Sequence, residues 1–127
     1  MASLAAIGIV SRDIRQSCRF YRTLGIDMPE PPDGDDHVEA ELPNGLRLML
    51  DTEELMRKLD ANWKRAEGHP ITLAFLCSDA AEVDATYARL TEAGFTGTTE
   101  PYDAFWGQRY ANVDDPDGND VALFAPL

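Results

Sequence analysis

The chain has 127 residues, of which 44% are hydrophobic and 27% charged. This length and composition fit one compact domain or two small units that share a core, and they exclude a disordered chain. The 23 acidic and 11 basic residues give a formal net charge of −12, which repels nucleic acid and anionic membrane surfaces. We therefore expect neither as a partner. The charge serves solubility or attracts a cationic small molecule.

Cysteine use and the N-terminal stretch predict the compartment. Cys18 and Cys77 are far apart in apolar surroundings and form no CxxC pair, as is typical of reduced core cysteines in a cytoplasmic protein. Residues 1–14 contain an apolar run shorter than the ~20 residues of a membrane span and lack the basic start of a signal peptide. We expect a soluble, cytoplasmic protein.

The first half of the chain reads as a strand, a helix and further strands. Asp13 follows an apolar strand and is placed to cap a helix by accepting hydrogen bonds from its first free N–H groups. Apolar residues then recur at helical spacing until Gly25. After another extended segment, residues 37–43 and 45–51 alternate with period two and are joined by a hairpin signal, Pro43-Asn44-Gly45.

The second half repeats this layout after a polar, helix-prone linker at residues 52–68, where Thr52 suits a helix start. Asp79 caps the second predicted helix, and Gly94 ends it. Three strands are predicted after that helix: residues 95–103, 106–113 and 119–125, the last two joined by the turn Asp115-Pro116-Asp117-Gly118.

The repeat predicts an α+β fold built from two βαβββ units in a single domain, residues 1–127. Unit 1 covers about residues 4–51, the linker helix about 52–68, and unit 2 about 69–125. Because each unit has one half-exposed sheet face, we expect the two to form a curved mixed sheet around a central cleft.

This layout resembles the vicinal oxygen chelate superfamily, which holds glyoxalase I, extradiol dioxygenases, fosfomycin-modifying enzymes and the bleomycin and mitomycin resistance proteins. The resemblance covers nearly the whole chain and is most specific in SRDIRQSCRFYRTLGI and WGQRYANVDDPDGNDVALF. The motifs FYRTLGI, HVEAEL, RLMLDTEE, GHP and LFAPL are most similar to the metal-free mitomycin- and bleomycin-resistance drug-binding proteins.

Enzymes of that superfamily hold a divalent metal with His, Glu or Gln side chains, whose nitrogen and oxygen atoms suit Zn, Fe, Mn and Ni. The resemblance places three of these ligand positions at Ala6, Thr72 and Ala122. Two methyl groups and one hydroxyl give a metal little to bind, so we expect no metal, no cofactor and no catalysis. A displaced site at His37 or His69 is the alternative.

Four aromatic residues gather near the last hairpin, and planar side chains bind planar molecules by stacking. Aromatic residues are also common in ordinary sheet cores, but Gly107 beside them favours close approach of a ligand. The four are Tyr102, Phe105, Trp106 and Tyr110. Alternation places Trp106, Gln108 and Tyr110 on one strand face, and Phe105, Gly107, Arg109 and Ala111 on the other.

The resemblance implies that Trp106 and His37 stack on the ligand, while Asp51, Arg109 and Tyr110 line or brace the cleft. Phe105 and Tyr102 complete the predicted ligand-binding set. Structural alternatives stay open for two residues: a salt bridge behind the strand for Arg109, and a cap of the linker helix for Asp51.

The sequence thus predicts an antibiotic-resistance protein that sequesters a planar aromatic drug, mitomycin- or bleomycin-like, in a hydrophobic cleft without a metal. The alternative is a divergent lyase or dioxygenase-like enzyme with a displaced metal site. Drug-binding members of the family pair as homodimers with clefts shared between chains, and two open half-sheets favour the same assembly here.

Overall fold

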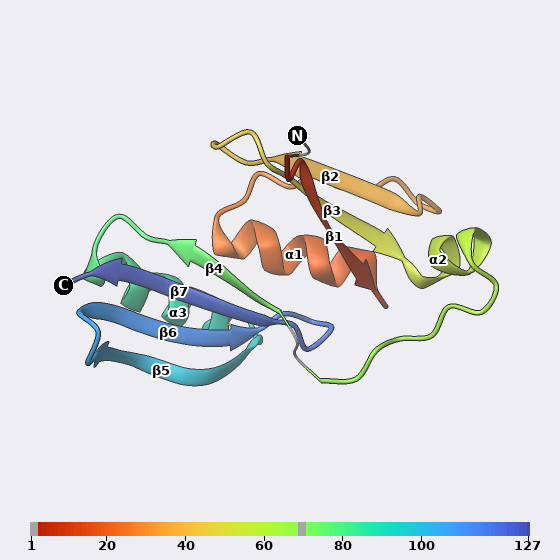
Figure 1. Cartoon of the computed structure of the whole chain (residues 1–127). Coiled ribbons are helices and arrows are strands. Elements are labelled where there is room, and N and C mark those ends of the chain that lie inside the picture. The colour runs from red at the N-terminus through yellow and green to blue at the C-terminus, as the bar shows by residue number, and fades with distance from the viewer. Residues whose placement is uncertain (1–2, 69–70) are drawn as a thin grey trace. The chain divides into compact units, whose positions relative to one another are not determined.

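The computed structural model describes residues 3–68 and 71–127, so His69, considered above as a metal ligand, lies outside the described residues. The chain folds into two compact units, Met1–Ala66 and Glu67–Leu127. Figure 1 labels the helices and strands of both units.

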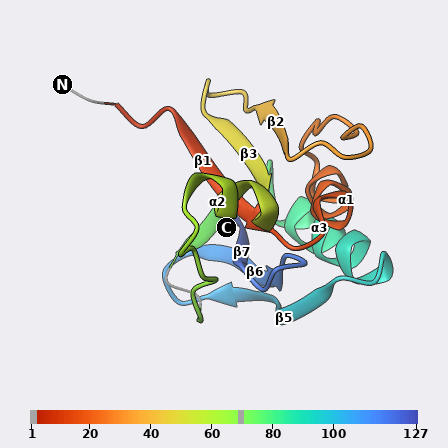
Figure 2. The same cartoon turned by 90° about the vertical axis from the view of Figure 1, so that its right-hand side faces the viewer.

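Unit 1 is a three-stranded mixed sheet with a helix on one face. In the sheet order β1-β3-β2, strand β3 runs parallel to β1 and antiparallel to β2. Figures 1 and 2 both show α1 along one face of this sheet. The elements are β1 (Ala6–Ser11), α1 (Ile14–Leu24), β2 (His37–Glu41), β3 (Arg47–Thr52) and α2 (Glu53–Leu59).

The helix α1 begins and ends as the sequence predicts. The Asp13 carboxylate accepts hydrogen bonds from the N–H groups of Arg15 (3.2 Å) and Gln16 (3.3 Å), and Gly25 takes a φ of 120°, which residues with a Cβ rarely adopt. The apolar stripe of α1 is buried against one face of the unit 1 sheet, to which alternate residues of each strand point. These buried residues are Cys18, Phe20, Tyr21 and Leu24 on the helix and Ile9, Val38, Ala40, Leu48 and Leu50 on the strands.

One predicted strand of unit 1 does not form, because residues 26–36 contain no strand. Three prolines in this segment lack the N–H group that a sheet ladder needs. Ion pairs hold the segment against α1 instead: Arg22 binds Glu30 at 2.7 Å, and Arg15 binds both Glu30 and Asp33. Unit 1 is therefore βαββ.

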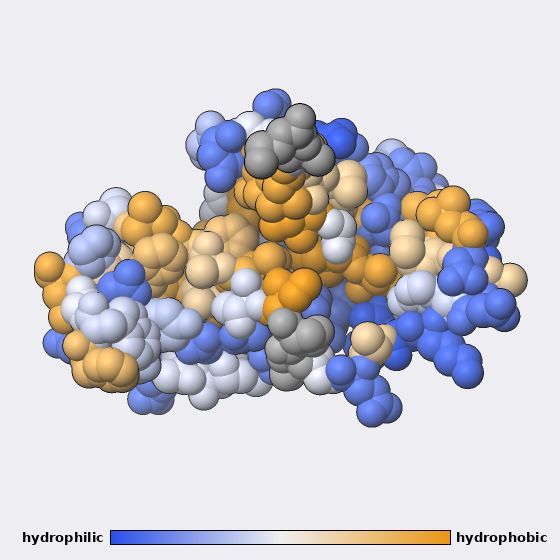
Figure 3. All heavy atoms as spheres, in the orientation of Figure 1, coloured by the Kyte–Doolittle hydropathy of each residue, from blue (hydrophilic) through white to orange (hydrophobic). Residues whose placement is uncertain are grey.

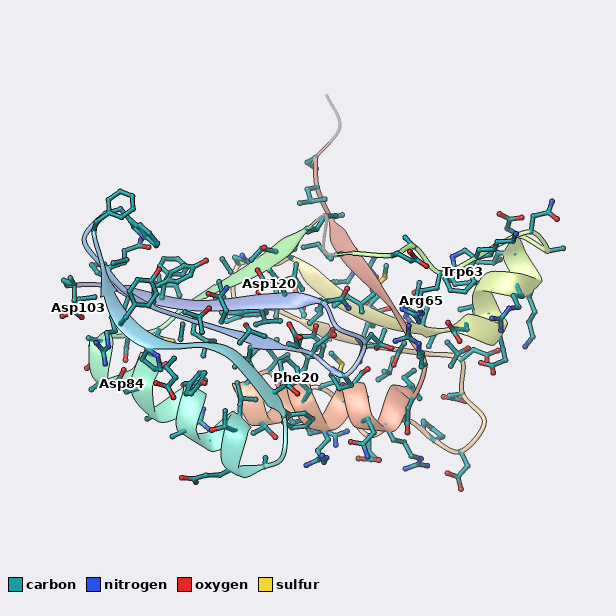
Figure 4. The ribbon with its side chains drawn as sticks, turned by 90° about the horizontal axis from the view of Figure 1, so that it is seen from below. Phe20, Trp63, Arg65, Asp84, Asp103 and Asp120 are labelled. Carbon is teal, nitrogen blue, oxygen red and sulfur yellow. The ribbon has the colours of Figure 1, made fainter. Side chains whose placement is uncertain are left out.

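The predicted linker helix is shorter than residues 52–68 and ends at Leu59. Thr52 caps it by accepting a hydrogen bond from the N–H of Leu55 at 3.1 Å. Beyond α2, the guanidinium carbons of Arg57 and Arg65 lie 5.6 and 5.8 Å from the centroid of the Trp63 ring; Figure 4 shows Trp63 and Arg65 near α2. Arg65 also donates to the carbonyl of Val10, so this segment is tied to unit 1.

Unit 2 is a four-stranded mixed sheet in the order β4-β7-β6-β5, with α3 on one face (Figures 1 and 2). The α+β class and the repeated strand-helix-strands layout are confirmed. The elements are β4 (Thr72–Leu76), α3 (Ala80–Glu92), β5 (Thr96–Ala104), β6 (Gln108–Asp114) and β7 (Asp120–Pro126).

Alternation divides the unit 2 sheet into two faces. The face that packs on α3 carries the fully buried residues Val113, Val121 and Leu123. We call the other face, turned away from α3, the distal face of unit 2. It carries Thr72, Ala74 and Leu76 of β4, Asp120, Ala122 and Phe124 of β7, Gln108, Tyr110, Asn112 and Asp114 of β6, and Tyr102 of β5.

No described helix is both long enough and apolar enough to cross a membrane.

Candidate functional site

The aromatic residues predicted near the last hairpin do come together. The centroid of the Trp106 ring lies 5.2 Å from the ring centroid of Tyr110, 5.1 Å from that of Phe105 and 6.3 Å from that of Tyr102. All these contacts are edge-to-face, the arrangement that aromatic quadrupoles favour. We call Tyr102, Phe105, Trp106 and Tyr110 the aromatic surface.

Trp106 lies in the turn between β5 and β6, not in a strand as predicted, because β6 begins only at Gln108. Gly107 has a φ of 90° there, so the turn geometry explains this glycine better than close approach of a ligand in a strand. The indole N–H of Trp106 donates to the Gln108 side chain at 2.7 Å. This bond and the contact with Tyr110 hold Trp106 on the distal side, as the alternation predicts.

Much of the aromatic surface is exposed, although aromatic side chains are costly to leave in water. Phe105 is 98% exposed, Trp106 47% and Tyr102 40%. Figure 3 shows orange, hydrophobic groups beside pale ones at the end of unit 2 near the C-terminus; tryptophan and tyrosine are among the pale residues on its scale. Contiguous exposed apolar groups of this kind mark binding surfaces.

Arg109 does not share a face with Tyr110. It points to α3, where its guanidinium binds both oxygens of Asp84 at 2.8 and 3.2 Å, and it also binds Asp103 at 3.1 Å. Asp84 and Asp103 lie at the same end of the unit (Figure 4). Of the two roles left open by the sequence, lining or bracing the cleft and a salt bridge behind the strand, this geometry is that of the salt bridge.

On unit 1, His37 belongs to a charged cluster on the sheet face turned away from α1. Its Nδ1 lies 2.5 Å from Oδ1 of Asp51, and its Nε2 lies 2.9 Å from Oε1 of Glu39. The second Glu39 oxygen accepts from Arg47 at 2.9 Å. We call His37, Glu39, Arg47 and Asp51 the charged cluster of unit 1.

The charged cluster favours a protonated His37. Hydrogen bonds to Asp51 and then Glu39 raise the pKa of His37 above its ordinary value, and the bond from His37 holds the pKa of Glu39 low. With carboxylates at both ring nitrogens, only the imidazolium form donates to both. Asp51 therefore positions His37, whereas Thr52 is the residue that caps α2.

The positions of the family's metal ligands offer few donor atoms. Ala6 pairs with Arg47, Ala122 is fully buried, and the Thr72 hydroxyl is occupied by a 2.6 Å hydrogen bond to Asp120. Across residues 3–68 and 71–127, no three His, Cys, Asp or Glu side chains are grouped to hold an ion. The residues present do not fit the family's metal.

A polar group on the distal face of unit 2 was not predicted from the sequence. The Asp120 carboxylate accepts from Thr72 at 2.6 Å and from the Asn112 amide at 3.1 Å, and Asp114 pairs with Asp120 across the strands. The sequence could have indicated this group, because Tyr110, Asn112 and Asp114 are spaced two residues apart and therefore lie on the same face of a strand.

A family model described as the glyoxalase/bleomycin resistance protein/dioxygenase superfamily matches residues 3–123. The chain belongs to this superfamily. An uncharacterized protein of Mycobacterium bovis is 33% identical over 98 residues, which cover 76% of this chain and 62% of that protein. A protein of Mycobacterium tuberculosis matches equally, over 56% of its length. The chain thus spans less than two thirds of these relatives.

Solved structures share the fold. An enzyme of this superfamily from Burkholderia phytofirmans has a TM-score of 0.86 at 21% identity, covering 99% of this chain and all of that one. A lactoylglutathione lyase from Agrobacterium tumefaciens has a TM-score of 0.72 at 22% identity, covering 98% and 94%. The description of the superfamily names both enzymes and a resistance protein, and these structural similarities show the fold alone.

Proposed function

We propose that this protein binds a planar aromatic molecule at the aromatic surface and sequesters it without chemical conversion. The observation that carries this proposal is the exposure of Phe105, Trp106 and Tyr102 in one contiguous group at the end of the unit 2 sheet.

The aromatic surface is suited to stacking. Edge-to-face contacts join the rings of Trp106, Tyr102 and Tyr110 to one another, so little freedom of these three side chains is lost when a ligand binds. A planar ligand gains about 0.5–1.5 kcal/mol for each aromatic pair beyond the burial of its area. The hydrogen bond to Gln108 leaves the Trp106 N–H satisfied, so the ring can meet an apolar ligand.

The finer parts of the proposal come from the family resemblance. They are that the ligand is a mitomycin- or bleomycin-like antibiotic, that His37 supplies a further planar contact, and that the protein acts as a cytoplasmic homodimer. A metal-dependent lyase or dioxygenase would need donor atoms where Ala6 and Ala122 carry only methyl groups.

The experiment uses two variants that each keep one tryptophan. Trp63→Phe leaves Trp106 as the reporter of the aromatic surface, and Trp106→Phe leaves Trp63, which contacts two arginines of unit 1. We would titrate both with quinone, intercalating and glycopeptide-type drugs and record fluorescence and melting temperature.

Quenching confined to the variant that keeps Trp106, with a rise in melting temperature for the same drugs, is the expected result. Quenching of Trp63 alone would place the ligand elsewhere. Flat signals with every drug would remove the sequestration proposal.

A further inference from the structure

The hydrogen bond between Trp106 and Gln108 determines how the Gln108 amide is oriented. The indole N–H of Trp106 donates to Oε1 of Gln108 at 2.7 Å. An indole nitrogen can only donate, so the atom of the amide that faces it must be the oxygen. The two N–H donors on Nε2 of Gln108 are therefore left for another partner.

These donors have no partner in the described part of the chain. Across residues 3–68 and 71–127, no group accepts a hydrogen bond from Nε2 of Gln108. The residues directly opposite Gln108 on the neighbouring strands are Ala104 on β5 and Pro126 on β7, whose side chains have no polar atom. Gln108 itself is partly buried. The amide thus presents two donors in apolar surroundings.

The donors lie beside the rings on which a planar ligand would stack. Gln108 and Tyr110 both project to the distal face, about 7 Å apart along β6, and the Trp106 ring contacts that of Tyr110. A fused-ring molecule stacked on Trp106 and Tyr110 therefore brings its edge to the Gln108 amide. An acceptor at that edge gains a hydrogen bond, whereas a C–H edge takes the donors out of water and leaves them unpaired, which costs free energy.

We propose that Gln108 determines the specificity of the aromatic surface, which selects planar molecules that carry a ring carbonyl at their edge. The inference rests on the proposed function, whose ligand class it narrows. Stacking supplies affinity for flat molecules in general and discriminates poorly between them. A site with a positioned donor rejects a molecule of similar shape that lacks the acceptor, because the donor is then left unpaired.

The test compares two probes built on fused rings of the same outline: anthraquinone, which has ring carbonyls, and anthracene, which has none. Each is joined through the same methylene group to an uncharged oligoethylene glycol chain that keeps it in solution. Titration calorimetry gives the ratio of the two dissociation constants for each variant. The different hydration of the probes is common to all variants, so it cancels when these ratios are compared.

Gln108→Glu is the central variant, because a carboxylate oxygen still accepts from the Trp106 indole while the N–H donors are lost. Gln16→Glu is the matched control: it makes the same change at the other glutamine of the chain, which is exposed on α1 of unit 1.

Gln108→Glu should change the ratio about tenfold against anthraquinone, through the lost hydrogen bond and the repulsion between carboxylate and carbonyl. Its affinity for the anthracene probe should stay within about threefold of the wild type, since stacking is retained. Gln16→Glu should leave the ratio within about twofold of the wild type, because its added charge is remote and screened. Gln108→Met removes the donors without adding a charge, so it should change the ratio in the same direction by about fivefold.

Two outcomes would overturn the inference: an unchanged ratio in Gln108→Glu, or a change of equal size in Gln16→Glu. If Gln108→Glu does not fold by circular dichroism, Gln108→Met decides, and an unchanged ratio in that variant overturns the assignment to Gln108. Failure of both probes to bind the wild type would instead count against the proposed function itself.

Discussion

The Nδ1 atom of His37 lies 2.5 Å from Oδ1 of Asp51, across the register pair that joins β2 to β3. The ring's other nitrogen faces Glu39. The imidazole therefore holds two carboxylates of neighbouring strands together, and its charge matters to the stability of unit 1.

This contact predicts how stability depends on pH. Folding raises the pKa of His37, so the folded state binds the proton more tightly than the unfolded chain. The stabilisation is complete below the ordinary histidine pKa of about 6.5 and is lost as pH rises through the raised folded value. The melting temperature of the wild type should therefore exceed that of His37→Gln at pH 5.5, and the difference should shrink towards pH 9.

Asp51→Asn is the control for this prediction, because it removes the carboxylate with the largest effect on His37. In that background, His37→Gln should show a smaller dependence on pH, and the NMR titration midpoint of the His37 ring should move down. A difference between wild type and His37→Gln that grows with pH would contradict the assignment.

A chelator should leave the melting temperature unchanged. Ala6 and Ala122 carry no donor atom, and the Thr72 hydroxyl is bound to Asp120, so a transition metal would contribute nothing to the folded state. The measurement is calorimetry with and without EDTA, together with metal analysis of protein purified without chelator. One tightly bound Zn, Fe, Mn or Ni per chain, lost together with stability, would show that a displaced site exists.

Gly97→Ala should destabilise unit 2. A Cβ there would overlap the end of the Tyr87 side chain of α3, so the ring must shift, and the substitution should cost about 1–3 kcal/mol of unfolding free energy through overpacking. Gly8→Ala is the matched control, because its Cβ would meet its nearest neighbour at an ordinary 3.6 Å. Chemical denaturation of both variants checks this, and equal stability of the two would contradict the packing described for unit 2.

Much of the fold could be predicted because short-range rules determine it. The helix starts at Asp13 and Asp79 follow from capping, and the hairpin between β6 and β7 follows from its Asp-Pro-Asp-Gly turn. The absent strand at residues 26–36 depends on proline content and on ion pairs to Arg15 and Arg22. The three prolines are evidence against a strand that can be read from the sequence. The ion pairs that join this segment to α1 cannot be read from the local sequence, because their partners lie in another element.

The candidate site was predictable in part, for the same reason. Alternation placed Tyr110 with Trp106, but whether Trp106 belongs to a strand or a turn depends on where the hairpin closes. Alternation along the strand placed Arg109 and Tyr110 on opposite faces of the sheet, but it could not show which face α3 covers. The ion pair of Arg109 with Asp84 of α3 shows that the helix covers the face of Arg109. His37 was picked out by resemblance, and its contact with Asp51 depends on the register between β2 and β3.

The most direct test of the central claim is titration calorimetry of acridine with the wild type, Trp106→Ala and Trp63→Ala, with each fold checked by circular dichroism. We expect Trp106→Ala to lose about 2 kcal/mol of binding free energy or more, roughly 30-fold in affinity, and Trp63→Ala to bind as the wild type does. Unchanged affinity in Trp106→Ala, or an equal loss in both variants, would contradict binding at the aromatic surface.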